Sequence, residues 1–371
     1  MNVTIKTDRL KEMVTRAAKG ASCNKLIPLT SLMGIELEDG VFRLITTNAT
    51  NYLYVREQGI AGDDFKVSVP VDVFVKLIAR TTSENVVLSV SDNALTVKGN
   101  GSYKIELPMD EDAGEVIKFP DPLSEVIFND TETKEINLST IKVILNSLRP
   151  ALAVTMEDPC YTGYYVGSSV IATDTYKIAC MDVDSLFGDD VLISSELMDL
   201  FNVMTSEKIT VDRSGNVIVF GSPDCVIYGN TMEGIEDFAV DAICGLVDTH
   251  FDSVCKIPKN ALLQVLDRLS LFVNQYDKNG IYLIFTNEGL QIKSKSASGV
   301  ETIPYFESND FKPFACCIDI EMFMSQLKAQ SVDMIELHYG LDNAIKMIDG
   351  NITHVIALLE DDVPDEELPF N

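Results

Sequence analysis

One order of elements occurs three times along the 371-residue chain, and this repeat restricts the possible fold more than any other feature. Each copy begins with a strand that leads directly into a short amphipathic helix. Three further strands follow, joined by turns rich in Gly, Asn and Asp. The copies lie at 67–108, 191–228 and 317–358. Repetition of this kind indicates successive copies of one structural unit.

The segments that precede these copies also match one another. Each contains a strand that runs into a helix, at 4–19, 136–148 and 256–272. A further strand follows in each, at 33–37, 164–166 and 281–285. We therefore predict an α+β fold of three tandem domains, each with two helices packed on two small antiparallel sheets.

The repeat lapses at two places, and these set the predicted domain boundaries. The first is the run Phe119–Pro122 with the polar residues after it, and the second lies across 245–253. The predicted domains are 1–122, 123–245 and 246–360, followed by an acidic C-terminal tail at 361–371.

The charge of the chain restricts how it can interact with nucleic acid. Its 57 Asp and Glu residues exceed its 29 Lys and Arg residues, which gives a formal net charge of −28. Most of such a surface repels phosphate, so a role on DNA must rest on local basic faces or on enclosure of the duplex. No apolar run reaches the about 18 residues of a membrane helix and no signal peptide is present, so we expect a cytoplasmic protein without membrane contact.

The sequence offers little for catalysis or for a cofactor. Its three histidines, His250, His338 and His354, have neither metal-ligand nor triad spacing, and no phosphate-binding glycine motif occurs. The eight cysteines include no Cys-x-x-Cys pair, which favours small buried side chains over disulfides or zinc ligands. Paired acids such as Asp189–Asp190 are able to bind Mg²⁺ but are more simply solvated. We predict no enzymatic activity, no cofactor and no metal.

Basic residues concentrate on helix faces that lie opposite apolar ones, although the helix after Ser194 is acidic. The first helix is expected to bury Leu10, Met13, Val14 and Ala17, and the second Val73, Phe74, Leu77 and Ile78. The basic residues expected at or beside such faces are Arg9, Arg16, Lys19, Lys25, Lys76, Arg80, Lys142, Arg149, Lys259, Arg268 and Lys328. These residues are either ordinary solvated residues of helix faces or a basic wall that contacts phosphates. The second interpretation rests on the concentration of Asp and Glu in the loops, which leaves the helix faces basic.

Two local matches give the sequence a family resemblance. The run Pro28–Met33 leads to a strand, the acidic turn Glu38–Gly40 and a second strand. The run Ala172–Ala179 reads Ala-Thr-Asp-Thr-Tyr-Lys-Ile-Ala. Both resemble the bacterial sliding clamp, the beta subunit of DNA polymerase III in the DNA clamp family. The resemblance covers nearly the whole chain and leaves open whether a host or a phage genome encodes it.

This resemblance implies a processivity factor without enzymatic activity. Two chains would join head to tail as a homodimer, so that six domains form a ring around double-stranded DNA without reading its sequence. The implied partners are the replicative DNA polymerase, a clamp loader and other clamp-binding proteins. The residues implied at the dimer interface are Ile105, Leu107, Leu271 and Phe272.

The resemblance also implies a slot for short peptides of partner proteins. Its implied residues are Tyr161, Thr173, Thr175, Tyr176, Lys177, Ile178, Val240, Met322, Met347, Val355, Ile356, Ala357, Leu358 and Leu359. This chain departs from the family where Thr175 and Tyr176 replace Gly and His, and where Ala357–Glu360 replaces a Met-Pro-Met-Arg ending. The tail triplet Leu368–Phe370 loosely resembles a clamp-binding peptide and is a candidate occupant, although a solvated terminus is the simpler interpretation.

A protein of another class fits the acidity equally well. An acidic viral structural protein, or a DNA mimic that blocks DNA-binding proteins, would need the negative surface but no ring. The basic residues on most helix faces argue against a mimic, which has no use for them.

Overall fold

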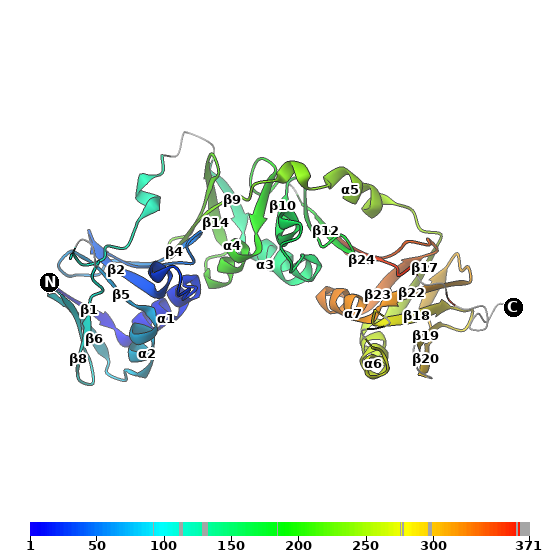
Figure 1. Ribbon diagram of the computed structural model, residues 1–371, viewed down its shortest axis with the longest axis horizontal. Coiled ribbons are helices and arrows are strands. Elements are labelled where there is room, and N and C mark those ends of the chain that lie inside the picture. The colour runs from blue at the N-terminus through cyan, green and yellow to red at the C-terminus, as the bar shows by residue number, and fades with distance from the viewer. Residues whose placement is uncertain are drawn as a thin grey trace. The chain divides into compact units, whose positions relative to one another are not determined.

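A computed structural model of the chain describes residues 1–91, 93–110, 114–127, 133–183, 185–274, 276, 278–295, 299–360 and 363. It divides into two compact units, one of residues 1–142 with 196–231 and the other of residues 143–195 with 232–371. Each unit has its own sheets and core (Figure 1). Nearly all of the predicted acidic tail lies outside the described residues.

The first unit contains two antiparallel sheets and the helices α1 (Thr7–Ala17) and α2 (Val71–Arg80). Its strands are β1 (Asn2–Lys6), β2 (Leu32–Glu38), β3 (Val41–Thr47), β4 (Tyr52–Gln58), β5 (Phe65–Pro70), β6 (Asn85–Ser91), β7 (Ala94–Lys98), β8 (Ser102–Glu106), β9 (Lys134–Asn137), β14 (Lys208–Ser214), β15 (Val217–Gly221) and β16 (Cys225–Asn230). They form a four-stranded sheet, β1-β6-β7-β8, and an eight-stranded sheet, β5-β2-β3-β4-β16-β15-β14-β9.

The second unit has the same plan with the helices α5 (Val240–Asp248), α6 (Lys259–Leu269) and α7 (Ile320–Ala329). Its strands are β10 (Gly163–Val166), β11 (Ser169–Thr173), β12 (Lys177–Asp182), β13 (Val191–Ser194), β17 (Ser253–Pro258), β18 (Gly280–Phe285), β19 (Leu290–Ser294), β20 (Val300–Ile303), β21 (Glu307–Asn309), β22 (Phe314–Asp319), β23 (Met334–Tyr339), β24 (Ala344–Asp349) and β25 (Ile352–Ala357). They form a nine-stranded sheet, β13-β10-β11-β12-β25-β24-β23-β17-β21, and a four-stranded sheet, β20-β19-β18-β22.

Two further helices and several short 3₁₀ helices complete the fold. The chain passes from one unit to the other within α3 (Leu138–Ser147) and within α4 (Ser195–Asp199). The 3₁₀ helices are η1 (Ala18–Gly20), η2 (Pro28–Ser31), η3 (Pro122–Glu125), η4 (Arg149–Ala151), η5 (Pro159–Thr162), η6 (Leu200–Val203), η7 (Ile235–Asp237) and η8 (Ser270–Phe272).

The predicted three-copy repeat is confirmed. In every copy a strand (β5, β13 or β22) leads directly into a helix (α2, α4 or α7), and three strands follow. The small sheets do not stay separate, however, because β4 pairs with β16 and β12 pairs with β25. Each pairing joins sheets of successive copies. The predicted boundary between residues 245 and 246 falls inside α5.

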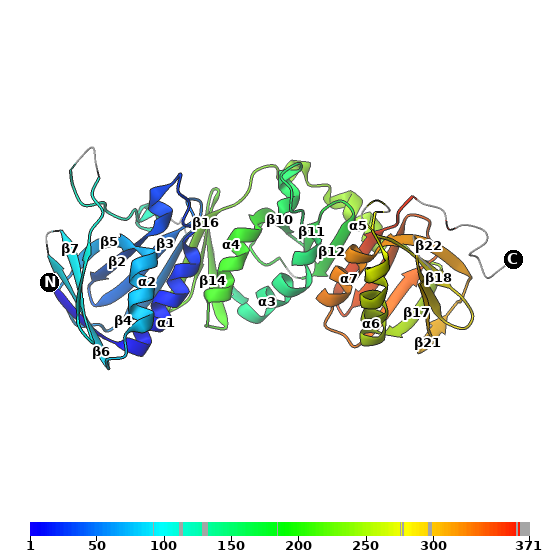
Figure 2. The same ribbon diagram turned by 60° about the horizontal axis from the view of Figure 1, so that its bottom comes forward.

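The helices pack through the apolar stripes read from the sequence, except at Val73 and Leu77 of α2, of which Leu77 is half-buried. In α1 the side chains of Leu10, Met13, Val14 and Ala17 are all buried, as predicted. In α2 the buried residues are Val71, Phe74 and Ile78, whereas Val73 is 52% exposed. The prediction that Val73 is buried is therefore wrong. Helices α1 and α2 lie side by side in both ribbon views (Figures 1 and 2).

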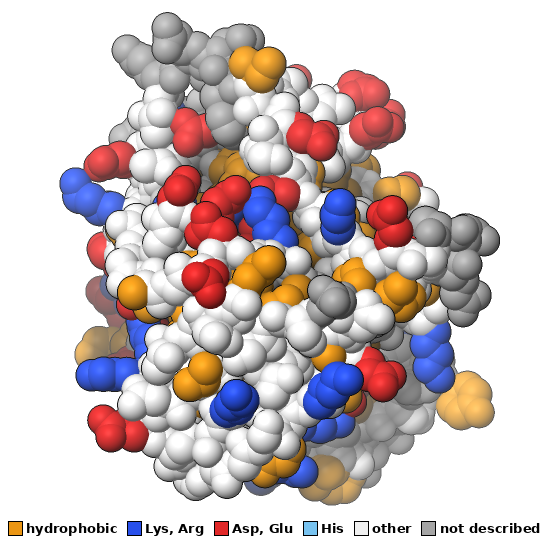
Figure 3. All heavy atoms as spheres, turned by 90° about the vertical axis from the view of Figure 1, so that its left-hand side faces the viewer, with side chains coloured by type: hydrophobic (Ala, Val, Ile, Leu, Met, Phe, Trp, Pro, Cys, Tyr) orange, Lys and Arg blue, Asp and Glu red, His pale blue; other side chains and the backbone are white. Residues whose placement is uncertain are grey.

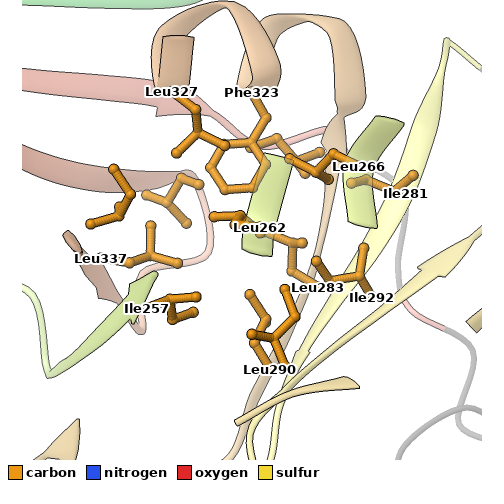
Figure 4. Packing of buried hydrophobic residues seen from close by; sticks show 14 of the residues in the cluster. Ile257, Leu262, Leu266, Ile281, Leu283, Leu290, Ile292, Phe323, Leu327 and Leu337 are labelled. Atoms are coloured by element: carbon orange, nitrogen blue, oxygen red, sulfur yellow. The ribbon is translucent and has the colours of Figure 1, made fainter. Parts of the chain in front are cut away.

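The core of the third copy shows how helices and sheets combine. Figure 4 shows Leu262 and Leu266 of α6 and Phe323 of α7 pointing toward apolar residues of β18 and β19. Each of these three side chains is 0% exposed. Burial of one such side chain contributes about 1.5–3 kcal/mol, so clusters of this size fix the helices on their sheets.

Two further features of the described part of the chain are the state of its cysteines and the lengths of its helices. Six of the cysteines are buried, Cys244 is half-buried and Cys23 is exposed, and none forms a disulfide. Within the described residues, no helix is both long and apolar enough to cross a membrane.

Candidate functional site

The predicted basic wall is only partly available for phosphates. Arg9 pairs with Glu12 and Glu57, and Lys76 lies 2.6 Å from a carboxylate oxygen of Asp72. Arg268 pairs with Glu301, and the Lys259 ammonium donates to the carbonyl oxygen of Gln330. Of the predicted wall residues, those that are exposed and have no hydrogen bond or ion pair to the described residues are Lys19, Lys25, Arg80, Lys142 and Lys328. Arg149 is exposed as well.

Arg16 has a different role from the predicted one. Its side chain is buried in the first unit, where Nη2 lies 2.5 Å from Oδ2 of Asp224 and Nε donates to the carbonyl oxygen of Val203 at 2.9 Å. The prediction that Arg16 lies on an exposed face is wrong. The reason is tertiary, because residues about 200 positions later cover the last turn of α1.

Two strand edges stand out because their equivalents are paired elsewhere in the chain. Strand β8 occupies the same place in the first copy as β16 and β25 do in the later ones, and β20 occupies the place of β4 and β12. The β16 edge pairs with β4, and the β25 edge pairs with β12. Strands β8 and β20 are the end strands of their four-stranded sheets.

The side chains near β8 differ from the predicted interface. Ile105 and Leu107 are 6% and 5% exposed, because their own unit covers them. That Ile105 and Leu107 lie at a dimer interface, through pairing of their strand, stays a prediction. Val73 and Tyr103 are 52% and 47% exposed instead, and they line a pocket of about 530 Å³ with Lys76 and Arg80 among others. Figure 3 shows an end of this unit where Lys and Arg stand among hydrophobic side chains.

The residues near β20 include exposed apolar side chains, whereas those near β8 line a pocket. Leu271 and Phe272 of η8 are 80% and 50% exposed, as the predicted interface requires, and Tyr276 is 99% exposed. The carboxylate of Glu301 lies on β20 itself, next to the exposed Val300. An apolar protrusion thus stands beside one free strand, and a pocket lined in part by apolar side chains stands beside the other.

The predicted peptide slot is divided between exposed and buried residues. Tyr176 and Thr175 are exposed, and Tyr161, Lys177, Val240, Met322, Ala357, Leu358 and Leu359 are half-buried. Thr173, Ile178 and Val355 are buried at 2%, 5% and 3% exposure. Met347 and Ile356 are 0% exposed in the core, so the prediction that they line an open slot is wrong. Both faces of β24 and β25 are covered, and Met347 and Ile356 pack in the core of the third copy together with Ile345.

The loop before β12 presents Tyr176 to solvent. The Asp174 carboxylate accepts hydrogen bonds from the backbone N–H of Tyr176 at 3.0 Å and of Lys177 at 2.7 Å. The backbone N–H of Ala357 donates to the carbonyl oxygen of Tyr176 at 2.9 Å. Thr175 has φ 75°, a left-handed conformation that is unfavourable for a β-branched residue. These hydrogen bonds hold the loop despite the strain, and Tyr176 is 62% exposed.

Replacing Thr175 by Gly is expected to raise the free energy of unfolding by about 0.5–1 kcal/mol, since Gly adopts φ near 75° without the steric cost. Chemical denaturation followed by circular dichroism measures the change. Thr175→Ala is the matched control, and its gain should be smaller because a Cβ atom remains. A loss of stability in Thr175→Gly would mean that the threonine side chain contributes more than its backbone strain costs.

Helix α5 covers part of the predicted slot and was not recognised in the sequence. Ile243 is buried in the cluster that contains Ile178 and Val355, and Val247 packs against it. The Lys346 ammonium donates to the carbonyl oxygens of Val247 at 3.1 Å and Thr249 at 2.8 Å, which caps the last turn of α5. The apolar spacing of Val240, Ile243, Cys244 and Val247 is the signal that would have predicted this helix.

The described residues offer no cluster typical of a metal centre. Within them, no three His, Cys, Asp or Glu side chains gather as metal ligands would. His354 is buried, and burial lowers its pKa to about 4, so it is neutral at physiological pH. Its Nδ1 lies 2.7 Å from Oε1 of Gln326, which makes it a core residue.

The three-copy arrangement and the two free strand edges define the clamp class of fold. The structure matches three solved proteins over nearly its full length: the DNA polymerase III beta subunit of Thermotoga maritima (17% identity, TM-score 0.81, 97% of this chain and 100% of that chain), the DNA polymerase sliding clamp of Bacillus subtilis (14%, 0.83, 98% and 100%) and the DNA polymerase III beta chain of Streptococcus pneumoniae (15%, 0.84, 97% and 100%). The chain therefore has the fold of the DNA polymerase III beta subunit. No protein-family model and no curated protein matches the sequence.

Proposed function

We propose that this chain is a DNA sliding clamp, a non-enzymatic processivity factor that encircles duplex DNA as a homodimeric ring. The observation that carries the proposal is the pair of free edges, β8 and β20. The corresponding edges of the other copies are already paired within the chain: β16 pairs with β4, and β25 pairs with β12. Pairing of β8 with β20 of a second copy repeats this joint at both ends, and a head-to-tail interface that closes by rotation forms a ring.

The chemistry beside the two edges supports their pairing. The pocket beside β8 is lined by Val73, Leu77 and Tyr103 together with polar residues, and the protrusion beside β20 carries the exposed Leu271 and Phe272. Apolar anchors that enter a pocket are typical of specific interfaces.

Enclosure also accounts for the acidity of the chain. A ring retains DNA without high affinity, so a formal net charge of −28 is compatible with function. The exposed residues Lys19, Lys25, Arg80, Lys142 and Lys328 supply basic charge that contacts phosphates without reading bases. The neutralised pairs of Arg9, Lys76 and Arg268 keep the direct attraction weak, which favours sliding.

The partners follow from the same proposal. The sliding clamps that this structure resembles belong to DNA polymerases. For this chain we propose a replicative polymerase, a clamp loader and proteins with short clamp-binding segments, the last of which dock beside Tyr176, Met322 and Leu358. The alternative of an acidic DNA mimic or viral structural protein is not favoured, because it leaves the two complementary strand edges without a purpose.

The test compares retention on circular and linear DNA. The full chain, mixed with nicked circular DNA and a compatible clamp loader, is expected to remain on the circle through gel filtration and to leave after the circle is cut. Native mass at micromolar concentration should be about twice the single-chain value of 40.9 kDa. A chain that stays monomeric, or that leaves circular and linear DNA equally fast, would disprove the clamp function.

A further inference from the structure

The residues that follow β25 form a surface on which apolar side chains are accessible. The backbone N–H of Ala357 bonds to Tyr176, that of Leu358 to Asn343 at 2.9 Å, and that of Leu359 to Cys317 at 2.9 Å. These bonds place Leu358 and Leu359 between the loop before β12, the turn before β24 and strand β22.

A pocket of about 280 Å³ lies on this surface. Seven of its lining residues have apolar side chains and two are acidic, but polar atoms make up most of its surface; the lining residues are Phe314, Ala315, Cys316, Cys317, Asp342, Leu358, Leu359, Glu360 and Val363. Asp342 and Glu360 are exposed. The pocket therefore has room for an apolar side chain. Its rim carries the negative charge of Asp342 and Glu360, and no Lys or Arg is among its lining residues.

Residues near Tyr176 also carry negative charge, like the rim of the pocket. Asp319 caps α7 by accepting the backbone N–H of Glu321 at 2.8 Å and of Met322 at 2.9 Å. Burial raises the pKa of the Asp319 carboxyl, while these hydrogen bonds and the charge of Lys177 act in the opposite direction. Glu321 is exposed beside the half-buried Met322.

Lys177, a basic residue beside Tyr176, is already neutralised. The Lys177 ammonium lies 3.1 Å from Oδ2 of Asp174 and donates to the carbonyl oxygen of Pro150 at 2.8 Å. Its side chain is 14% exposed. The carboxylates of Glu321, Asp342 and Glu360 thus meet a docking segment without a competing cation.

We infer that the peptide segments that dock on this surface combine large apolar side chains with Lys or Arg. The inference rests on the proposed clamp function and adds the chemistry of the partner. The apolar side chains enter the pocket beside Leu358 and Leu359, and the cations face Glu321, Asp342 and Glu360. The exposed ring of Tyr176 also favours a cation over its face.

The tail of the chain carries charge of the same sign as this rim. Residues 361–371 contain five acidic residues and no Lys or Arg. Val363, the one described residue of the tail, lines the pocket. The candidate occupant Leu368–Phe370 lies outside the described residues and stays a prediction.

A selection from random peptides tests the inference without a presumed motif. Twelve-residue peptides displayed on phage are selected on the full chain at low ionic strength. We expect the enriched peptides to carry two or more large apolar residues and a net positive charge. Enrichment of neutral or acidic peptides, or of no peptide, would overturn the inference.

One enriched peptide is then measured by fluorescence anisotropy. Its affinity is expected to fall about tenfold for the Glu321→Gln, Asp342→Asn, Glu360→Gln variant, because exposed charge pairs each contribute a few-fold. The control is Asp64→Asn, Glu115→Gln, Glu125→Gln, which removes equal charge from exposed positions in the first unit and should leave affinity unchanged. An equal loss in both variants would overturn the inference, since it would show only a net-charge effect.

Failure of the inference and failure of the clamp function give different results. A chain that is retained on circular DNA but selects neutral peptides remains a clamp and contradicts only the predicted partner chemistry. A chain that selects basic peptides but is not retained contradicts the clamp function and leaves the acidic docking surface supported.

Discussion

A chain carrying Leu271→Asp and Phe272→Asp is expected to remain a monomer at micromolar concentration. In the proposed ring these side chains enter the pocket beside β8, where Val73 and Tyr103 are exposed to receive them. Burial of the two native side chains contributes about 1.5–3 kcal/mol each, and carboxylates at these positions add a desolvation cost. Self-association should weaken by about 10³-fold or more.

Sedimentation velocity and retention on circular DNA measure this effect. The matched control is Val154→Asp with Met156→Asp, because Val154 and Met156 are 99% and 73% exposed in the same unit but far along the chain from η8 and β20. The control should assemble and be retained like the native chain. A Leu271, Phe272 double variant that still forms a two-chain ring would mean that the interface lies elsewhere.

The fold was predictable from the sequence as far as it depends on local patterns. The repeat, the helices and most strands follow from apolar spacing and from turns, so the three-copy plan was predicted correctly. The pairing of β4 with β16 and of β12 with β25 was not, because an edge strand has the same alternation whether it pairs or not. Helix α5 was missed because the repeat has no helix at that position.

The candidate site was less predictable because exposure depends on segments distant in sequence. Arg16 fits a solvated helix face by spacing, yet Val203 and Asp224 cover it. Val73 fits a buried face, yet nothing of its own unit covers it, and it stays exposed. Met347 and Ile356 matched a family pattern but lie in the core. Helical spacing identifies two faces of a helix and leaves undecided which neighbouring segment lies on each.

Removal of the Asp224 carboxylate is expected to be among the most destabilising single changes in the first unit. The carboxylate pairs with Arg16 and accepts hydrogen bonds from Thr205 at 2.9 Å and Ser222 at 3.0 Å. Asp224→Asn leaves the buried guanidinium with only the exposed carboxylate of Glu12, at 3.4 Å, as a counter-charge, which costs about 3 kcal/mol. Arg16→Met combined with Asp224→Asn should recover part of the loss, since no unpaired charge then remains.

The pH dependence of this pair gives a separate test of the same interaction. Burial opposes ionisation of Asp224, but hydrogen bonds from Arg16 and Thr205 and the charge of Arg16 outweigh it and lower the pKa to about 2 from 3.8. Its folded pKa is depressed, so the stabilisation is fully present above about pH 4 and is lost as pH falls through 2. Ionisation of Asp224 therefore contributes about 2 kcal/mol to the free energy of unfolding at neutral pH.

Native chain and Asp224→Asn should therefore differ most in stability near pH 5 and converge as the pH approaches 2. Urea unfolding followed by circular dichroism at several pH values measures the difference between them. Asp64→Asn, at an exposed position in the same unit, is the control and should match the native chain throughout this range. A constant difference between native and Asp224→Asn from pH 5 to pH 2 would mean that the mutation acts through packing, because an ionised carboxylate is the only part of the interaction that acid removes.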